Sequence, residues 1–573
     1  SRMLPNSGSL DRGQAAFLMG QGYEILQDRL KAIESYQKAV ELDFEQTQTR
    51  LRLARLLMGS DAAAAEMHVR EVLKVDRENA LARRLLALIL AASGDDGDWD
   101  EVAALLDPTA SRTTIDAAGD NRVRAILLSK RGRSRAERLE NIEQARAILA
   151  DQVNRGSGDV NDYDRILLAG VYEQRALLGD DDSSLEAARD QFRMLVDRSD
   201  VPAANLKLYV EFLLRHVERL SGQMAESTAV EALVERMIDD AVYRLDELKR
   251  IEADNAGNIE TADIVGLEAR LLAAQGRAEE AVQTVGQFAE QQIDGLDEQL
   301  STDAAKRAEA QICLTAGNLL TAIEEHQEAE KFFRRLTEIV PQTYVLLVRC
   351  LATQGRADEA VDFCLNLSDG PLRPDVAVTL ASLLTDAQNR SPERNDVQAA
   401  VDSALESNPE QIDLLLAVAA MRVSEGNEPE AIKLYRRVVE LSPDHSLALN
   451  NLATMLADQP NSRTEALAII EHALKVTGRR PALLDTQGTI LLKAGDAAQA
   501  VVCLEEATAG GSSDPRYYFH LAAAYAGADR IDDARETLAT ANDLGLEQAL
   551  LTDSDRQLIR QLQRELNQSG ENK

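Results

Sequence analysis

The sequence is poor in the residues that interrupt helices and in those that favour sheets. Its 573 residues include only 31 glycines and 13 prolines, and aromatic side chains make up 4% of the chain. Alanine, leucine, glutamate, aspartate, glutamine and arginine are abundant instead, and most of these lose little conformational entropy in a helix. Few β-branched or aromatic runs remain from which strands could form. We therefore expect an all-α protein.

Cysteine and catalytic signatures are scarce as well. The four cysteines are scattered and form no CxxC pair: Cys313, Cys350, Cys364 and Cys503. We interpret them as small apolar residues on helix faces, with a Cys350–Cys364 disulfide in an oxidising compartment as the alternative. The chain contains no P-loop, HExxH or GxSxG motif, and its six histidines are dispersed. We therefore expect no enzyme, no cofactor and no metal site.

Positive charge is in short supply. Lys and Arg number 63 against 97 Asp and Glu, so the formal net charge is −34, while hydrophobic residues still make up 45% of the chain. This composition indicates an acidic folded protein, whose field opposes general binding to nucleic acid. No apolar run approaches the roughly 20 residues of a membrane helix, so direct membrane insertion is not expected. The first residues, SRMLPNSGSL, contain no signal-peptide core. Localisation stays open: cytoplasmic, or periplasmic or membrane-tethered if a leader or anchor preceded residue 1.

What the sequence does contain is an internal repeat, clearest in three segments, 450–476, 485–508 and 520–543. Each has an apolar stretch with a small residue inside it, then a turn, then a second stretch opened by an alanine. These alanines, Ala466, Ala500 and Ala534, recur every 34 residues. Two helices that cross closely need small side chains at the contact. Both stretches of each segment have a small residue that can serve this purpose. The small residues of the first stretches are Ala453, Gly488 and Ala522.

This pattern resembles the tetratricopeptide repeat family, whose unit is two antiparallel helices of about 34 residues. Weaker copies occur upstream, marked by Gly20, Tyr36, Ala54, Ala65, Ala169, Ala188, Ala269, Ala281, Gly317, Phe333, Gly355 and Ala360. The resemblance implies an α-solenoid of tetratricopeptide-type helix pairs, roughly a dozen of them, forming a right-handed superhelix. The style of the units also resembles bacterial members of the family.

The quality of the pattern divides the chain into seven segments. We expect N-terminal repeats at 11–107, a loop at 108–120, divergent repeats with long helices at 121–258, and further repeats at 259–367. An irregular helix pair with an insertion follows at 368–409, then regular repeats at 410–549 and a C-terminal capping helix at 550–568. The Gly/Pro-containing segment SDGPLRPD and the insertion SPERND are expected to interrupt the stack.

Two groups of residues are candidates for partner binding. In the family, the first helix of each unit lines the concave face that grips partners, and amide and imidazole groups there can bind the backbone of an extended peptide. By resemblance, the candidates on this face are Asn450, Asn451, Thr454, Asp485, Gln487, Thr489, Lys493, Arg516 and His520. The second group makes residues 122–138 locally basic in a chain that is acidic overall. It consists of Arg122, Arg124, Lys130, Arg131, Arg133, Arg135 and Arg138. These residues either dock an acidic peptide, phosphate or acidic lipid head group, or pair with the protein's own acids.

The resemblance implies a protein–protein interaction scaffold that accepts a peptide or a folded partner on its concave face. Its partners would be other proteins or peptide segments. Two alternatives place the same scaffold elsewhere: a periplasmic or membrane-tethered assembly for export or the cell envelope, or the regulatory arm of an enzyme encoded upstream of residue 1. Self-association through the ends of the solenoid is a third possibility.

Overall fold

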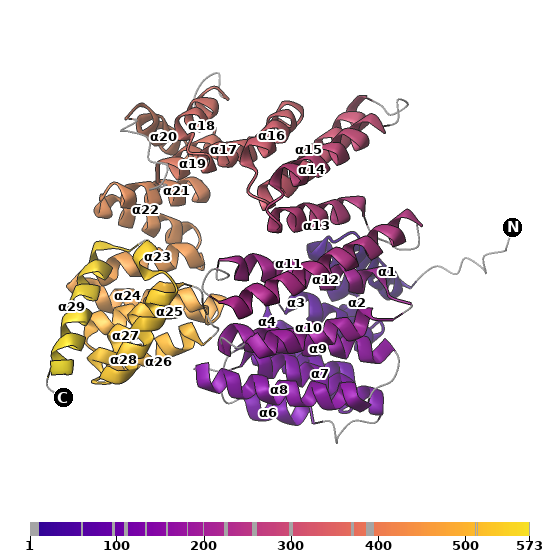
Figure 1. Cartoon of the computed structure of the whole chain (residues 1–573). Coiled ribbons are helices and arrows are strands. Elements are labelled where there is room, and N and C mark those ends of the chain that lie inside the picture. The colour runs from indigo at the N-terminus through magenta and orange to yellow at the C-terminus, as the bar shows by residue number, and fades with distance from the viewer. Residues whose placement is uncertain are drawn as a thin grey trace. The chain divides into compact units, whose positions relative to one another are not determined.

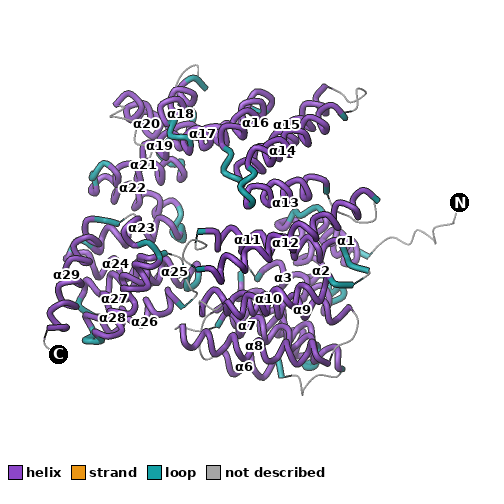
Figure 2. Tube along the Cα trace, in the orientation of Figure 1, coloured by secondary structure: helices purple, strands orange, loops and turns teal. Residues whose placement is uncertain are grey.

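The computed structural model describes most of the chain, and its described residues form 29 α-helices and no strand (Figure 2). The described residues are 11–58, 61–93, 98–107, 113–131, 135–155, 159–179, 182–198, 200–222, 227–254, 260–296, 302–367, 372–385, 395–509, 512, 514–549 and 551–571. Among these residues, no helix is both long and apolar enough to cross a bilayer. The prediction of an all-α fold built from helix pairs is confirmed.

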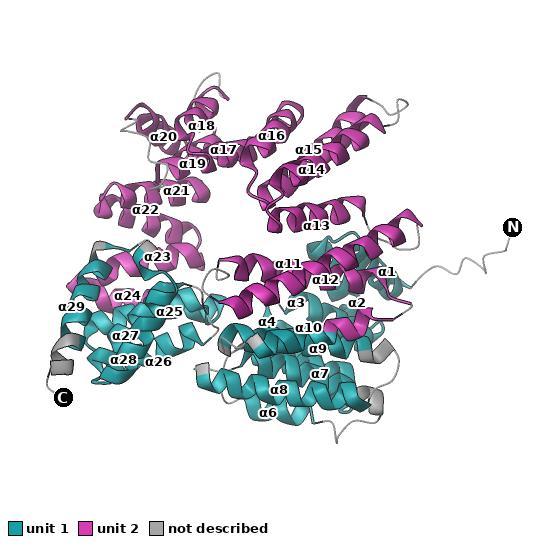
Figure 3. Ribbon diagram, viewed as in Figure 1, with its two compact units in different colours: residues 1–191, 471–573 teal, residues 192–470 magenta. Residues whose placement is uncertain are grey.

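The helices group into two compact units, residues 1–191 with 471–573, and residues 192–470 (Figure 3). The boundaries fall within two helices, α10 (Asp182–Val196) and α24 (Arg463–Thr477), and therefore inside the predicted segments 121–258 and 410–549. The first unit contains α1 (Arg12–Ile25), α2 (Arg29–Glu41), α3 (Gln46–Leu57), α4 (Ala62–Val75), α5 (Ala80–Ser93), α6 (Asp98–Leu105), α7 (Thr114–Lys130), α8 (Arg135–Arg155) and α9 (Asp159–Gly179), together with α25 (Pro481–Ala494), α26 (Ala497–Thr508), α27 (Pro515–Gly527), α28 (Ile531–Asp543) and α29 (Asp553–Glu571).

The second unit holds the central helices of the chain, drawn from magenta to orange in Figure 1. They are α11 (Ala203–Ser221), α12 (Thr228–Ala253), α13 (Thr261–Ala274), α14 (Ala278–Asp294), α15 (Thr302–Ala322), α16 (His326–Ile339), α17 (Tyr344–Thr353), α18 (Ala357–Leu365), α19 (Pro374–Thr385), α20 (Asn395–Ser407), α21 (Ile412–Ser424), α22 (Glu428–Leu441) and α23 (Ser446–Ala457). In both units, neighbouring helices pack as pairs, such as α1 with α2, α15 with α16 and α25 with α26.

Local sequence signals begin and end many of these helices. Asp28, Asp61 and Asp496 each accept a hydrogen bond from the backbone N–H three residues later, which satisfies a free donor of the first turn. After α25, Gly495 takes a left-handed conformation with φ of 87°, which an L side chain rarely adopts. The chain can therefore reverse within a few residues and start the second helix of the pair.

Small residues bring the two helices of a pair together, as the repeat predicts. At Gly20, an ideal Cβ would lie 2.6 Å from a ring carbon of Tyr36, so only glycine fits there. The same relation holds between Gly317 and Phe333, at 2.5 Å, and between Gly488 and Leu504, at 2.4 Å. In all three pairs, the side chain over the glycine comes 16 residues later. The alanines of the repeat are also fully buried, including Ala466, Ala500, Ala522 and Ala534.

Two of the smaller predictions can be compared with individual helices. The predicted loop at 108–120 is too long, because α7 already begins at Thr114; residues 108–112 lie outside the described part. Good helix formers such as Ala117, Ala118 and Arg122 outweigh the single Gly119 there. All four cysteines are buried and free, so the interpretation as small apolar residues is confirmed and the Cys350–Cys364 disulfide is not formed.

Candidate partner-binding groove

A groove lies within the second unit, across three helices that are each the first of a pair: α17, α19 and α21. Its volume is about 810 Å³. The lining residues are Gln342, Tyr344, Val345, Val348, Arg349, Ala352, Thr353, Pro374, Asp375, Val378, Thr379, Ser382, Leu383, Gln411, Asp413 and Leu416. A groove across consecutive first helices is the arrangement that the repeat is expected to use for binding, but its position was not predicted from the sequence.

The floor of this groove is apolar. Val348, Ala352 and Leu383 are buried beneath it, whereas Val345 keeps 38% of its surface exposed. An exposed valine among buried apolar neighbours offers an apolar side chain of a ligand a contact that excludes water. The groove can therefore bind apolar groups through its floor.

Polar groups lie on its rim, and several of them are hydrogen-bonded around Asp375. The hydroxyl of Tyr344 lies 3.3 Å from a carboxylate oxygen of Asp375 and 3.3 Å from Oγ1 of Thr379. Arg373 donates hydrogen bonds to the same carboxylate and thereby lowers the pKa of Asp375. Burial raises the pKa of Tyr344, so its hydroxyl stays protonated. This corner of the rim therefore carries paired charges and hydroxyl groups.

Two further rim residues carry opposite charges. Among the described residues, neither Arg349 on α17 nor Asp413 on α21 forms an ion pair. Together with the Arg373–Asp375 pair, they leave the rim close to neutral, although the chain as a whole has a net charge of −34. The amide side chains of Gln342 and Gln411 add donors and acceptors that carry no charge.

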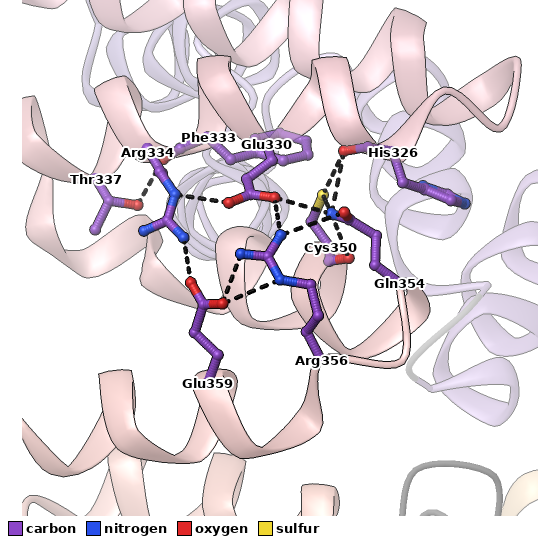
Figure 4. A network of polar contacts seen from close by, with 9 residues as sticks. All are labelled: His326, Glu330, Phe333, Arg334, Thr337, Cys350, Gln354, Arg356 and Glu359. Carbon is purple, nitrogen blue, oxygen red and sulfur yellow. Dashed lines mark hydrogen bonds and ion pairs between the residues drawn. The ribbon is translucent and has the colours of Figure 1, made fainter.

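The position of α17 is set on its other side by a network of charged residues (Figure 4). Glu330 of α16 pairs with Arg334, at 2.7 Å, and with Arg356. Both arginines also bind Glu359 of α18, each at 2.6 Å, so the four side chains form a closed ring. Burial would raise the pKa of Glu330, but hydrogen bonds from Arg334, Arg356 and Gln354 outweigh it and lower that pKa.

The ring is continued by residues at the end of α17. Figure 4 shows Cys350 and Gln354 side by side below the start of α16. The Cys350 thiol donates to the backbone oxygen of His326, at 3.1 Å, and the Gln354 amide donates to Glu330, at 3.1 Å. These contacts tie α16, α17 and α18 together and leave the opposite side of α17 facing the groove.

The residues predicted on first helices lie elsewhere, on α23, α25 and α27. Two of the predicted amides face neighbouring helices: Asn451 donates to the Tyr435 hydroxyl at 3.2 Å, and Gln487 accepts from the Cys503 thiol at 3.2 Å. The buried Oδ1 atom of Asn450 has no hydrogen-bond partner among the described residues. The remaining members of this set are Thr454 on α23, Asp485, Thr489 and Lys493 on α25, and Arg516 on α27.

His520 is buried, and both of its ring nitrogens are engaged. Nδ1 lies 2.8 Å from Asp485 of α25, and Nε2 lies 3.3 Å from Asp555 of α29. Burial alone would lower the pKa of His520, but the two carboxylates outweigh burial and raise it to about 9. The same contact lowers the pKa of Asp555. In this arrangement, the imidazolium connects three helices and does not present a free nitrogen to a peptide.

The basic residues of 122–138 that the structure describes lie in different environments. Arg122 pairs with the buried Asp164, at 2.5 Å, and Arg131 stacks 4.4 Å over the Trp99 ring. Arg138 is partly buried, and burial lowers its pKa. On α7, Arg124 and Lys130 are exposed. Of the rest, Arg133 and the side chain of Arg135 lie outside the described part of the chain.

Comparison with known proteins agrees with this architecture. Two models of the tetratricopeptide repeat match the chain, at residues 13–46 and 486–544. The chain is 26% identical over 215 residues to TPR repeat-containing protein PA4667 of Pseudomonas aeruginosa, a match that covers 37% of this chain and 35% of the relative. Stacked helix pairs with glycine and alanine at their crossings define an all-α helical-repeat protein. The chain therefore contains tetratricopeptide repeats in these two segments.

Solved structures with a distant likeness include yeast Tom70 and a tetratricopeptide repeat protein from Parabacteroides merdae. For Tom70, the identity is 14%, the match covers 97% of this chain and 96% of that chain, and the TM-score is 0.35. For the second protein, the identity is 15%, the match covers 44% of this chain and 98% of that chain, and the TM-score is 0.34. Neither likeness bears on the function of this chain.

Proposed function

We propose that this chain is a protein-interaction scaffold that holds a short segment of a partner protein in the groove of α17, α19 and α21. The observation that carries the proposal is the apolar floor of this groove beneath a nearly neutral, hydrogen-bonding rim. Tetratricopeptide repeat proteins are typically non-catalytic scaffolds, which agrees with a role in holding a partner.

The spacing of the helices limits the length of the bound segment. Packed helices lie about 8–10 Å apart, so three neighbouring first helices span roughly 16–20 Å between the outer axes. An extended chain covers about 3.4 Å per residue, which gives a segment of about five or six residues. An extended segment also points every second side chain the same way, so two or three side chains would reach the floor.

The chemistry of the groove limits the sequence of that segment. Valine and leucine side chains at the floor favour apolar residues, and Gln342, Gln411 and Thr379 can bind the backbone of the segment without regard to its sequence. The net charge of −34 repels acidic segments at a distance. We therefore expect an uncharged or weakly basic segment with apolar residues at alternate positions.

The proposal can be tested without knowing the partner. A random peptide library would be displayed on phage and selected on the full chain, and an enriched peptide would then be titrated by fluorescence polarisation. Val345→Asp places a charge on the apolar floor and should weaken binding at least about tenfold, because the carboxylate must lose water when the peptide covers it. The matched control is Val423→Asp on α21, because Val423 is similarly exposed, at 44%, but does not line the groove.

Several results would contradict the proposal. They include a selection that enriches no peptide, one that enriches acidic peptides, and an enriched peptide whose affinity is the same for wild type and Val345→Asp. If Asn451→Ala or Gln487→Ala weakens binding and Val345→Asp does not, the peptide binds at α23 or at α25, respectively, and not in this groove. Circular dichroism would establish that each variant keeps its helical content.

A further inference from the structure

Helix α1 is apolar on both of its faces, although only one of them is covered. Gly13, Ala16, Phe17 and Gly20 are buried against the following residues. The opposite face carries the exposed stripe, which consists of Leu18, Met19, Ile25 and Leu26 with exposed fractions between 45% and 82%. A helix that is apolar all round is normally buried on all sides.

The exposed stripe also lacks charge. The two charged residues of α1 are Arg12 and Glu24. Glu24 points to the covered side, where it accepts a hydrogen bond from Tyr36 and pairs with Arg52 at 2.6 Å. Leu30, at the start of α2, is a further apolar residue beside the end of the stripe and is 81% exposed. Among the described residues, a quarter of the exposed large apolar side chains therefore fall within residues 18–30.

Gly22 lies in the middle of this stripe, and no contact within the chain requires a glycine at this position. At Gly13 and Gly20, an added Cβ would lie 2.6 Å from Phe44 and Tyr36, respectively, so the fold itself requires glycine there. At Gly22, an added Cβ would have no atom within 4 Å. Glycine inside a helix is unfavourable relative to alanine, and a frequent compensation is the close approach of another backbone.

The stripe is symmetric about this glycine. Leu18 and Leu26 lie four residues before and after Gly22, and Met19 and Ile25 lie three residues before and after it. An antiparallel copy of the same helix, related by a two-fold axis through Gly22, would therefore place leucine on leucine and methionine on isoleucine. Such self-complementarity is what a two-fold interface between identical chains requires.

We propose that a second copy of this chain docks here, with α1 packed antiparallel on α1 and the two Gly22 backbones in contact. The charge of the chain limits where two copies can meet. Two chains of net charge −34 repel each other, and the exposed stripe is a surface on which they can meet without burying a charge. The proposal is independent of the peptide groove, which lies in the other unit.

Sedimentation equilibrium of the full chain over roughly 1 to 100 μM tests the proposal. We expect the weight-average mass to approach that of two chains. Leu26→Glu should weaken the dimer at least about 100-fold, because the symmetry introduces the buried charge twice. The double variant Leu18→Lys/Leu26→Glu should restore it, since each lysine then faces a glutamate of the other copy. Val75→Glu is the control, because Val75 is 85% exposed at the end of α4 and lies outside the stripe.

A cross-link locates the axis. Gly22→Cys should form a disulfide-linked dimer on mild oxidation, because position 22 would face itself across the interface, whereas Val75→Cys should not; the four native cysteines are buried. A chain that stays monomeric at all concentrations overturns the proposal. So does dimerisation only after residues 1–10 are deleted, because the stripe would then be covered by its own N-terminal segment. A dimer that survives Leu26→Glu also overturns it, because the dimer would then form through another surface.

Discussion

Close approach of the paired helices is the physical basis of this fold, and Gly488→Ala tests it with one added carbon. The new Cβ would lie 2.4 Å from Cγ of Leu504 and 2.9 Å from both of its methyl carbons. Carbon atoms in contact prefer a separation of about 3.5–4.0 Å. The two helices or the Leu504 side chain must therefore move apart by about 1 Å. Leu504 is fully buried and has no free space to enter. Overpacking of this kind costs about 1–3 kcal/mol.

A gain in helix propensity partly offsets this cost. Alanine is better than glycine inside a helix by about 1 kcal/mol, so the net destabilisation of the α25–α26 pair should be about 1 kcal/mol. Gly286→Ala in α14 is the matched control, because its added Cβ has no atom within 4 Å. That variant should be stabilising by about 0.5–1 kcal/mol.

Hydrogen exchange measured by mass spectrometry can detect the destabilisation by Gly488→Ala and the stabilisation by Gly286→Ala separately, since repeat proteins open locally and in contiguous units. Amides of 481–508 should exchange about fivefold faster in Gly488→Ala, and amides of 278–294 should exchange more slowly in Gly286→Ala. If Gly488→Ala instead slows exchange in α25 and α26, close contact does not require glycine at this crossing. The explanation of the repeat given above would then be wrong.

Two further predictions concern the charged networks. The raised pKa of His520 means that its stabilising effect is complete below about pH 6.5 and is lost as pH rises towards 9. The protection of α27 and α29 against hydrogen exchange should therefore fall over that range, by on the order of 3–4 kcal/mol at most. His520→Gln should remove this pH dependence, and a variant that keeps it would show that the dependence has another source. Glu330→Gln removes the charge that both arginines share and should destabilise α16–α18 by about 1–2 kcal/mol while leaving α25 and α26 unchanged. Equal exchange in wild type and Glu330→Gln would mean that the network does not position α17.

The helix pairs were predictable from the sequence because their cause is local. A small residue recurring with a fixed spacing predicts where two helices can touch, and Gly20, Gly317 and Gly488 lie at such contacts. The position of Cys350 and Cys364 on buried helix faces also follows from the pattern. These features depend on residues close together in the sequence, so no knowledge of distant contacts was needed.

The groove was not predictable in the same way. It lies where the repeat is least regular and includes Pro374 and Asp375 in its lining. The exposure of Val345 depends on how α17, α19 and α21 are spaced.

The environment of His520, by contrast, could have been predicted from a spacing in the sequence. Asp485, His520 and Asp555 follow one another at intervals of 35 residues, so an acid, a histidine and an acid occupy equivalent places on successive first helices.

Ion pairs link successive helix pairs, between first helices, as in Lys207–Asp263 and Arg270–Glu218, and also between second helices. Arginines on the second helix of one pair bind glutamates on the second helix of the next, as in Arg70–Glu101, Arg334–Glu359 and Arg436–Glu465. Each such exposed pair contributes only about 0–1 kcal/mol, so these contacts add little to stability individually. Their consequence is electrostatic, because they place part of the acidic excess beside arginines on the second helices. The first helices α17, α19 and α21 can then present a nearly neutral groove within a strongly acidic chain, and a partner that binds there encounters apolar contacts and hydrogen bonds before it encounters charge.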